Sequence, residues 1–353
     1  MYFTSDNAVG AAPEILDAMM TANEGALPSY GADPMMAEVE ATISKIFETP
    51  CRVFLVSTGT AANALALASL SPPWGVVFCH RYAHIEVDEC GAPEFFGGGL
   101  KLALLDGPNG KIQPDALREA LTETGAGGVH QVQPAVLSLT NVTEAGELYR
   151  ADEVAALSAL AHEKDCAVHL DGTRFANALV SSNASPADMS WRAGVDVLCL
   201  GATKNGALAA EAVIFFDPER QADRISQFEY RRKRGGHLIS KGRMLSSQMT
   251  AYLKDDLWLT LARRSNDAAA QLAAGLREIA GVEIENVVDA NMLFAHLPLK
   301  IHRALQAEGA RYYLEPPSQS EDGNGETVRV RFVTSFSTSD EAIESFLAIA
   351  SKA

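Results

Sequence analysis

Short apolar runs rich in β-branched residues recur along the first two thirds of the chain, and stretches with helical spacing separate them. The expected strands are 52–56, 76–79, 136–139, 167–170, 195–200 and 212–216. The intervening segments 60–70 and 152–164 carry apolar residues at the spacing of an amphipathic helix. This alternation predicts an α/β fold with a mainly parallel sheet, and ligands bind such sheets beyond the carboxyl ends of the strands.

The pattern changes after about residue 248. A long helical stretch at 249–280 precedes a mixture of strands and helices, expected at 282–288, 291–296, 300–308, 327–333 and from 340 onward. We therefore predict a large domain at 1–248, with an N-terminal arm, and a small C-terminal α+β domain at 249–353. A length of 353 residues suits two domains of about 150 residues each. The polar stretch 318–326 is expected to be a solvated hairpin turn.

Composition narrows the classes of function. The net charge of −16 opposes nonspecific binding to nucleic acid and to anionic membranes. The N-terminus has neither a basic region nor an apolar core of the kind that marks a signal peptide, and no apolar run reaches the ~18 residues of a membrane span. The five cysteines form no CxxC motif, which favours reduced, mostly buried thiols and a cytoplasmic location. No cluster of carboxylates or histidines argues for a metal.

A segment of small residues, Ser57 to Asn63, joins an expected strand to an expected helix. Small side chains let backbone N–H groups approach an anion, and a helix N-terminus adds partial positive charge. The hydroxyl of Thr60 can add a further hydrogen bond to such an anion. Serine and threonine at such a junction are also common as plain helix caps.

Two charged residues follow later strands. Asp171 ends an apolar strand, where a carboxylate is costly to bury unless it is paired; it could hold a protonated pyridine nitrogen or simply cap a turn. Lys204 follows the next strand among small residues. A lysine held there can act as an imine-forming nucleophile, although most lysines are solvated surface groups.

The run Arg231 to Arg234 is strongly basic in an otherwise acidic chain. In such a chain the run indicates an anion site, and one of its arginines could reach a phosphate of this subunit or of a neighbouring one. For most of its members we expect a solvated face or a contact between subunits.

Taken together and in order, these motifs resemble the threonine aldolase family of fold-type I pyridoxal-phosphate (PLP) enzymes, in the subgroup of low-specificity L-threonine and phenylserine aldolases. The segments that carry the resemblance are 4–7, 29–34, 57–60, 84–91, 169–174, 202–206, the basic run at 231 and 330–334. Each segment is weak by itself, and their shared order along the whole chain is specific.

The resemblance implies a role for each matching residue. For the cofactor, PLP, it implies that Lys204 forms the Schiff base, Asp171 pairs with the pyridinium, and His84 stacks on the ring. The phosphate would be held by Gly59, Thr60 and Arg232. The substrate carboxylate would be bound by Ser5, Arg174 and Arg331, with Tyr30 lining the site of this subunit or of a neighbouring one. The family also implies a homotetramer built from two catalytic dimers.

One departure from the family concerns the catalytic base. Many relatives carry a histidine in a Glu-Asn-Thr-His stretch after the strand at 136–139, and this chain has Thr143 at about that position. The proton of the substrate's β-hydroxyl must then go elsewhere. His84, directly or through a water, is the preferred acceptor, and His130 is another candidate.

The expected reaction is cleavage of L-threonine, L-allo-threonine and related β-hydroxy-α-amino acids to glycine and an aldehyde. A phenylserine-preferring aldolase, a PLP-dependent β-eliminating lyase and an aminotransferase would share Lys204 and Asp171. From a different class, a non-catalytic PLP-binding sensor would usually bring a DNA-binding domain, and none is recognisable here.

Overall fold

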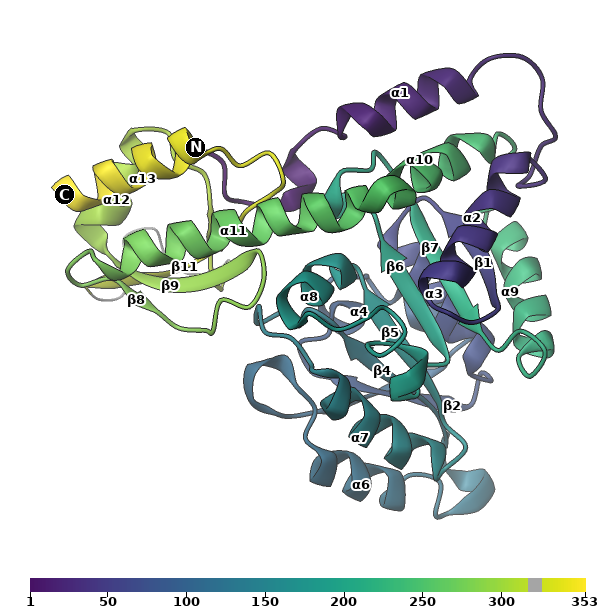
Figure 1. Ribbon diagram of the computed structural model, residues 1–353. Coiled ribbons are helices and arrows are strands. Elements are labelled where there is room, and N and C mark those ends of the chain that lie inside the picture. Colours follow the sequence, from purple (N-terminus) through teal and green to yellow (C-terminus); the bar gives the residue numbers. More distant parts are fainter. Residues whose placement is uncertain (317–325) are drawn as a thin grey trace.

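The computed structural model describes residues 1–316 and 326–353. Apart from its last residue, the hairpin turn expected at 318–326 lies outside the described residues. The chain forms a large α/β unit and a smaller unit at its C-terminal end, joined by a long helix (Figure 1).

The large sheet has the strand order β1-β7-β6-β5-β4-β2-β3. β7 runs antiparallel to both of its neighbours, and the other strand pairs are parallel. The strands are β1 (Cys51–Val56), β2 (Gly75–His80), β3 (Lys101–Leu105), β4 (Gln133–Thr140), β5 (Ala167–Gly172), β6 (Val197–Gly201) and β7 (Glu211–Phe216). The predicted α/β class with a mainly parallel sheet is confirmed.

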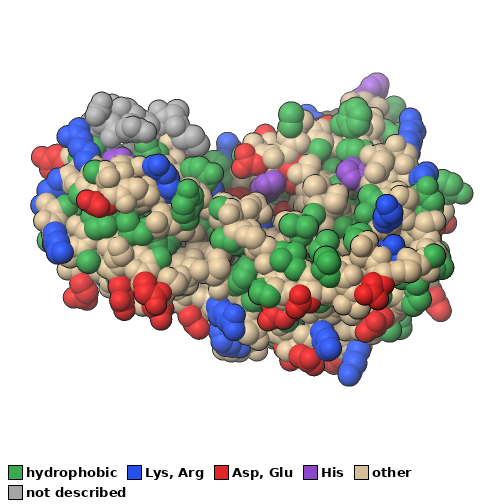
Figure 2. All heavy atoms as spheres, turned by 90° about the horizontal axis from the view of Figure 1, so that it is seen from above, with side chains coloured by type: hydrophobic (Ala, Val, Ile, Leu, Met, Phe, Trp, Pro, Cys, Tyr) green, Lys and Arg blue, Asp and Glu red, His purple; other side chains and the backbone are tan. Residues whose placement is uncertain are grey.

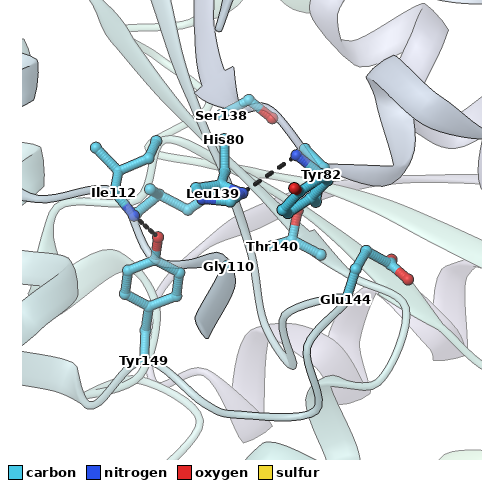
Figure 3. A pocket seen from close by; sticks show the side chains of 10 residues that line it. His80, Tyr82, Gly110, Ile112, Ser138, Leu139, Thr140, Glu144 and Tyr149 are labelled. Atoms are coloured by element: carbon cyan, nitrogen blue, oxygen red, sulfur yellow. Dashed lines mark hydrogen bonds between the residues drawn. The ribbon is translucent and has the colours of Figure 1, made fainter. Parts of the chain in front are cut away.

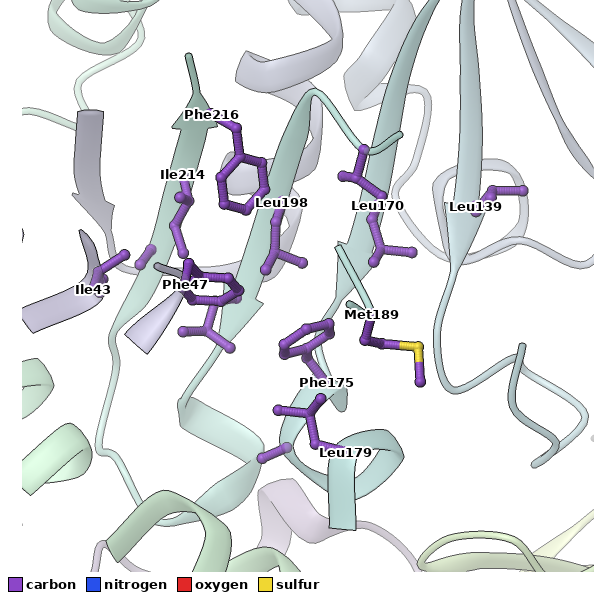
Figure 4. Close-up of a cluster of buried hydrophobic side chains, with 14 of the residues drawn as sticks. Ile43, Phe47, Leu139, Leu170, Phe175, Leu179, Met189, Leu198, Ile214 and Phe216 are labelled. Atoms are coloured by element: carbon purple, nitrogen blue, oxygen red, sulfur yellow. The ribbon is translucent and has the colours of Figure 1, made fainter. Parts of the chain in front are cut away.

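Helices cover both faces of this sheet, so its strands are buried on both sides. In β1, Val53 and Leu55 belong to one core cluster, and Phe54 and Val56 belong to the other. The first cluster includes side chains of α2, α7 and α8, and the aromatic rings of Phe47 and Phe175 lie within it (Figure 4). The second cluster includes α3 and α9. The helices of this unit are α1 (Pro13–Ala22), α2 (Pro34–Ile46), α3 (Gly59–Leu70), α4 (His84–Val87), α5 (Ala92–Gly97), α6 (Pro114–Glu123), α7 (Ala151–His162), α8 (Phe175–Ser182), α9 (Ala222–Arg234) and α10 (Arg243–Leu253).

The smaller unit is an antiparallel sheet of order β10-β11-β9-β8 that packs against three helices. Its strands are β8 (Glu283–Ile284), β9 (Met292–Pro298), β10 (Tyr313–Leu314) and β11 (Thr327–Val333), and its helices are α11 (Leu257–Arg277), α12 (Leu299–Ala307) and α13 (Asp340–Lys352). The predicted small α+β unit is confirmed. Phe3, from the N-terminus, is fully buried in its core.

Three local expectations need correction. The helix expected at 249–280 is two helices, α10 and α11, because Asp255 and Asp256 adopt positive φ angles of 51° and 55° and break the hydrogen-bond ladder. The strand expected at 282–288 is reduced to β8. The strand β3 was not predicted, because Lys101–Leu105 contains no β-branched residue.

The division at residue 248 remains a proposal. α10 spans this position and packs against α1 and α2, so a cut at 248 would fall inside a helix of the large unit. Among the described helices, none has the length and apolarity needed to cross a membrane. Four of the five cysteines are buried and none is in a disulfide, whereas Cys90 is exposed.

Gly201 ends β6 three positions before Lys204 and has no room for a side chain. A Cβ atom at Gly201 would lie 2.6 Å from the Cα of Thr173, and backbone atoms cannot move aside as the end of a side chain can. Gly201→Ala should therefore lower the free energy of unfolding by about 1–3 kcal/mol, measured by urea denaturation. Gly10→Ala is the matched control, since no heavy atom lies within 4 Å of its added Cβ. Equal stabilities of the two variants would contradict this account.

Candidate active site

The segment that bears Lys204 follows β6 and is held from several sides. Asn205 donates hydrogen bonds from Nδ2 to the Tyr252 hydroxyl and to the Trp258 carbonyl, both at 2.8 Å. The carbonyl of Gly206 accepts a hydrogen bond from the Ala12 N–H at 2.8 Å, which fastens the N-terminal arm to this segment. Lys204 itself is half-buried. Its backbone is therefore fixed while its side chain remains accessible.

Asp171 lies at the same edge of the sheet, near the end of the neighbouring strand β5. It is 2% exposed, and its Oδ1 atom accepts hydrogen bonds from the Thr173 hydroxyl at 2.7 Å and the Thr173 N–H at 3.0 Å. Burial alone would raise the pKa of Asp171, but the hydrogen bonds from Thr173 and the nearby rings of His84 and His169 outweigh it, so the pKa lies below its usual value. Asp171 is therefore kept ionised, as the partner of a pyridinium must be.

A chain of hydrogen bonds leads from Asp171 to His84. The Nδ2 atom of Asn63 donates both to Asp171 Oδ2 and to Glu89 Oε1, each at 2.9 Å. Glu89 Oε1 in turn lies 2.8 Å from Nδ1 of His84. Asn63 and Glu89 are almost completely buried, whereas the His84 side chain is 27% exposed. The imidazole thus stands at the open end of a buried polar chain.

The N-terminus of α3 lies beside Asp171. Thr58 caps this helix by accepting the Ala61 N–H at 3.1 Å, and the N–H groups of Gly59 and Thr60 in the first turn have no partner within the helix. A Cβ atom at Gly59 would stand 3.8 Å from the Thr173 hydroxyl, which places this cradle next to the Asp171 turn. The position and the free donors suit a phosphate group.

Arg232, on α9, contacts β1, the strand that leads into this cradle. Its Nη2 atom donates to the Leu55 carbonyl at 2.7 Å, and its buried Nε has no hydrogen-bond partner. Burial lowers the pKa of Arg232 to about 10. A buried guanidinium with an unused donor is costly unless an anion completes it, which fits the phosphate role expected of Arg232.

Arg174 lies at the start of α8 in the large unit, and Arg331 lies on β11 in the small unit. Arg174 forms a buried, two-point ion pair with Asp6, with Nε–Oδ2 and Nη2–Oδ1 distances of 2.7 and 3.0 Å. Asn291 of the small unit also donates to Asp6, at 3.0 Å. Arg331 on β11 has a buried Nε without a partner, and its guanidinium lies over the ring of Tyr313. These contacts of Arg331 lie within the small unit, so the expected binding of a carboxylate by Arg174 and Arg331 together stays a prediction.

Two predicted residues remain, Ser5 and Tyr30. Ser5 caps the short turn Asp6–Ala8, which packs against the turn Thr203–Asn205 that carries Lys204. Tyr30 is 49% exposed, and the ammonium of Lys233 lies 4.7 Å from the centre of its ring. Ser5 is thus brought to the Lys204 segment, whereas Tyr30 lies on the surface of this chain, and its expected place in a neighbouring subunit's site stays a prediction.

The surface is indented between the two units (Figure 2). Near the end of β4, a small pocket is lined by His80, Tyr82, Thr140, Glu144 and Tyr149, among others (Figure 3). Glu144 follows Thr143 directly, and its charge contributes to raising the pKa values of both His84 and Arg174, behind the larger effects of Glu89 and Asp6.

The sequence reasoning missed four acidic or amide side chains here: Asp6, Asn63, Glu89 and Glu211. Glu211 is 4% exposed and accepts the Ala202 N–H at 3.2 Å. Burial raises its pKa to about 7, against the opposing hydrogen bond from Thr203 and the charge of Lys204. Asp6, Asn63 and Glu89 lie within the motifs at 4–7, 57–63 and 84–91. The sequence does not mark which side chain each of them contacts.

The chain is similar to known proteins over most of its length. A family model described as "Beta-eliminating lyase" matches residues 3–298. The chain belongs to this family. It is 42% identical to the low specificity L-threonine aldolase of Pseudomonas aeruginosa over 311 residues, 88% of each chain. With the Escherichia coli K12 protein of the same name it shares 25% identity over 293 residues, 83% of each chain.

Solved structures agree with this assignment. The structure matches that of Leishmania major threonine aldolase with a TM-score of 0.91 and 29% identity, covering 99% of this chain and 98% of that one. It also matches Sphingomonas wittichii serine palmitoyltransferase with a TM-score of 0.71 at 13% identity, over 100% and 86% of the two chains, which supports the fold alone. The resemblance to threonine aldolases and the fold-type I architecture expected from the sequence are both confirmed.

The Asp6–Arg174 pair gives a stability prediction. Asp6→Asn leaves a buried guanidinium without its counter-charge, so the free energy of unfolding should fall by about 3 kcal/mol at pH 7. Burial raises the pKa of Asp6, but Arg174 lowers it by more. The stabilisation is therefore complete above the unfolded pKa of about 3.9 and is lost as the pH falls through the lower folded value.

The measurement is urea denaturation of both proteins between pH 3 and pH 7. Asp106→Asn is the control, since it breaks an exposed pair with Arg81 and should cause a smaller loss. A loss for Asp6→Asn that does not exceed the control, or that is unchanged at the lowest pH, would contradict the predicted role of the pair.

Proposed function

We propose that this chain is a PLP-dependent aldolase that cleaves L-threonine, L-allo-threonine and related β-hydroxy-α-amino acids to glycine and an aldehyde. The observation that carries the proposal is the meeting of Lys204 and an ionised Asp171 at one edge of the sheet. β5 and β6 are neighbours, with Asp171 opposite Cys199, and the turns that follow the two strands touch at Gly201 and Thr173. The 42% identity to the Pseudomonas aeruginosa aldolase supports the substrate class.

The residues present fit PLP. Asp171 suits the ring nitrogen, the first turn of α3 and the unpaired Nε of Arg232 suit the phosphate, and Lys204 supplies the amine. When bound, PLP draws off the electron pair that is released when a bond to the substrate's Cα breaks.

The chain's own residues then determine which bond breaks. Arg174 and Arg331, with Ser5, would hold the substrate carboxylate and so would select which bond to Cα breaks. His84 accepts the proton of the β-hydroxyl. His84 is the accessible last member of the hydrogen-bonded series that runs from Asp171 through Asn63 and Glu89. This position supports both this role and the expected stacking on the ring.

Two other side chains are less suited to accept that proton. Thr143 is buried, and its hydroxyl donates to the Asn109 carbonyl at 2.9 Å. His130 precedes β4, which begins at Gln133, so it lies at the amino end of the sheet, opposite the Lys204 edge. We therefore retain His84 as the base.

The finer expectations complete the proposal. The enzyme would act in the cytoplasm as a homotetramer of two catalytic dimers, in which Tyr30 lines a neighbouring subunit's site. The half-exposed ring of Tyr30 is compatible with such a contact.

β-Elimination is the second candidate reaction, because the matching family is named for it. An eliminating enzyme would convert a hydroxy-amino acid such as serine or threonine to a keto acid and ammonia, and it would form no glycine. The two reactions are therefore separated by their products.

Lys204→Ala is the decisive variant. We expect glycine release from L-threonine to fall by at least about 10³-fold, equivalent to roughly 4 kcal/mol of transition-state stabilisation. The measurement is glycine and keto acid formation by the PLP-loaded protein, with the exposed Lys45→Ala as control. Retained glycine release in the Lys204 variant would refute the proposal, and keto acid as the main wild-type product would favour β-elimination.

A further inference from the structure

The buried polar chain behind His84 is unexplained by the roles considered so far. Binding PLP requires Asp171, and stacking on its ring requires only the imidazole of His84. Neither task needs a second carboxylate, yet Glu89 is buried with a side chain that is 0% exposed. Burying a carboxylate costs free energy. A buried carboxylate that the cofactor does not require therefore suggests a contribution to function.

The turn after α4 brings Glu89 beneath His84. α4 is a single helical turn that begins at His84, and the left-handed backbone of Cys90 and Gly91, with φ angles of 53° and 71°, redirects the chain immediately afterwards. Glu89 thus points inward while its neighbours on both sides are exposed. Its Oε1 atom receives both Asn63 Nδ2, at 2.9 Å, and His84 Nδ1, at 2.8 Å.

This geometry determines which nitrogen of His84 carries the proton. The Asn63 atom between the carboxylates of Asp171 and Glu89 must be the amide nitrogen, because an amide oxygen there would face two acceptors. As a carboxylate, Glu89 has no proton to donate, so its Oε1 atom accepts hydrogen bonds from both Asn63 and His84. It follows that Nδ1 of His84 carries a proton, and that Nε2 of the neutral ring has the free lone pair.

We infer that Glu89 is the positioning residue that holds His84 with its Nε2 atom free to take the proton of the substrate's β-hydroxyl, an inference that rests on the proposed function. The O–H bond breaks as Nε2 gains the proton, and the oxygen's electron pair forms the C=O bond of the aldehyde. The Cα–Cβ bond breaks, and its electron pair stays with the carbon that becomes glycine. The arrangement is that of a buried carboxylate orienting a catalytic histidine.

The charges around the ring act in the same direction. The hydrogen bond from Glu89 is the largest influence that raises the pKa of His84; burial opposes it, and Asp171 on β5 and Glu144 after β4 add to it. Other described histidines near this edge are engaged at both ring nitrogens: His80 with Gly107 and Tyr82, and His169 with Ser138 and Cys199. Glu89 thus makes His84 more basic as well as fixed in orientation.

The test is Glu89→Gln, which keeps the shape and removes the charge. The pKa of His84, followed by NMR of the histidine-labelled protein without substrate, should fall, and His84→Asn identifies its resonance. With PLP bound, kcat for L-threonine should drop about 10- to 100-fold, while KM changes little because Glu89 does not touch the substrate. The acid limb of the pH–kcat profile should move to lower pH along with the histidine.

Glu86→Gln is the matched control, since Glu86 lies on the same turn with an exposed side chain and should leave both quantities unchanged. Glu89→Asp retains the charge at a longer distance, so its His84 pKa should lie between those of wild type and Glu89→Gln. Should Glu89→Gln fail to fold, the comparison of Glu89→Asp with wild type carries the test alone.

An unchanged His84 pKa in Glu89→Gln would overturn the inference, as would an unchanged kcat and pH profile. The NMR titration needs no turnover, so it separates this inference from the proposed function. A lowered pKa in a protein that forms no glycine would refute the reaction and leave the tether between Glu89 and His84 intact.

Discussion

Asp171 carries a negative charge in the interior of the large unit, and much of the site can be understood as the means of keeping it there. Thr173 supplies two donors from the following turn, and Asn63 supplies a third from α3. Because the first turn of α3 is also the proposed phosphate site, one helix would set both ends of the cofactor site. The distance between a charge partner and an anion cradle is thereby fixed by a rigid element, which is the condition for holding a planar ligand in one orientation.

The sequence predicted the large sheet well because its strands are short, apolar and rich in β-branched residues, and because helices bury both faces. It failed where that signal is absent. The edge strand β3 has leucine and alanine in place of valine and isoleucine, and two successive aspartates break the α10–α11 stretch by their backbone conformation alone. Neither feature leaves a periodicity in the sequence, so composition could not reveal it.

For the site, the motifs supplied the residues that are expected to meet the cofactor, and they could not supply the buried groups that contact those residues. Asp171 and Lys204 stand out because a charge follows a buried strand. Asn63 looked like one more helical residue, and its two carboxylate contacts come from residues 26 and 108 positions away in the sequence. Arg174 was expected to bind a carboxylate, and its buried partner Asp6 came from the far end of the chain. Contacts of this kind arise only when the chain folds.

The N-terminal arm carries Phe3, whose side chain is buried in the core of the small unit. The Phe3 N–H donates to the Arg311 carbonyl, and the Phe3 carbonyl accepts from the Val333 N–H. Three residues later, Asp6 forms its ion pair with Arg174 of the large unit. The first six residues therefore connect the two units of the molecule, and Ser5 lies between the two points of attachment. A shift of the small sheet would move Ser5, Asp6 and Arg331 together, and with them the groups that are proposed to bind a substrate carboxylate. Movement of the small unit relative to the large unit and release of that carboxylate would then be one motion.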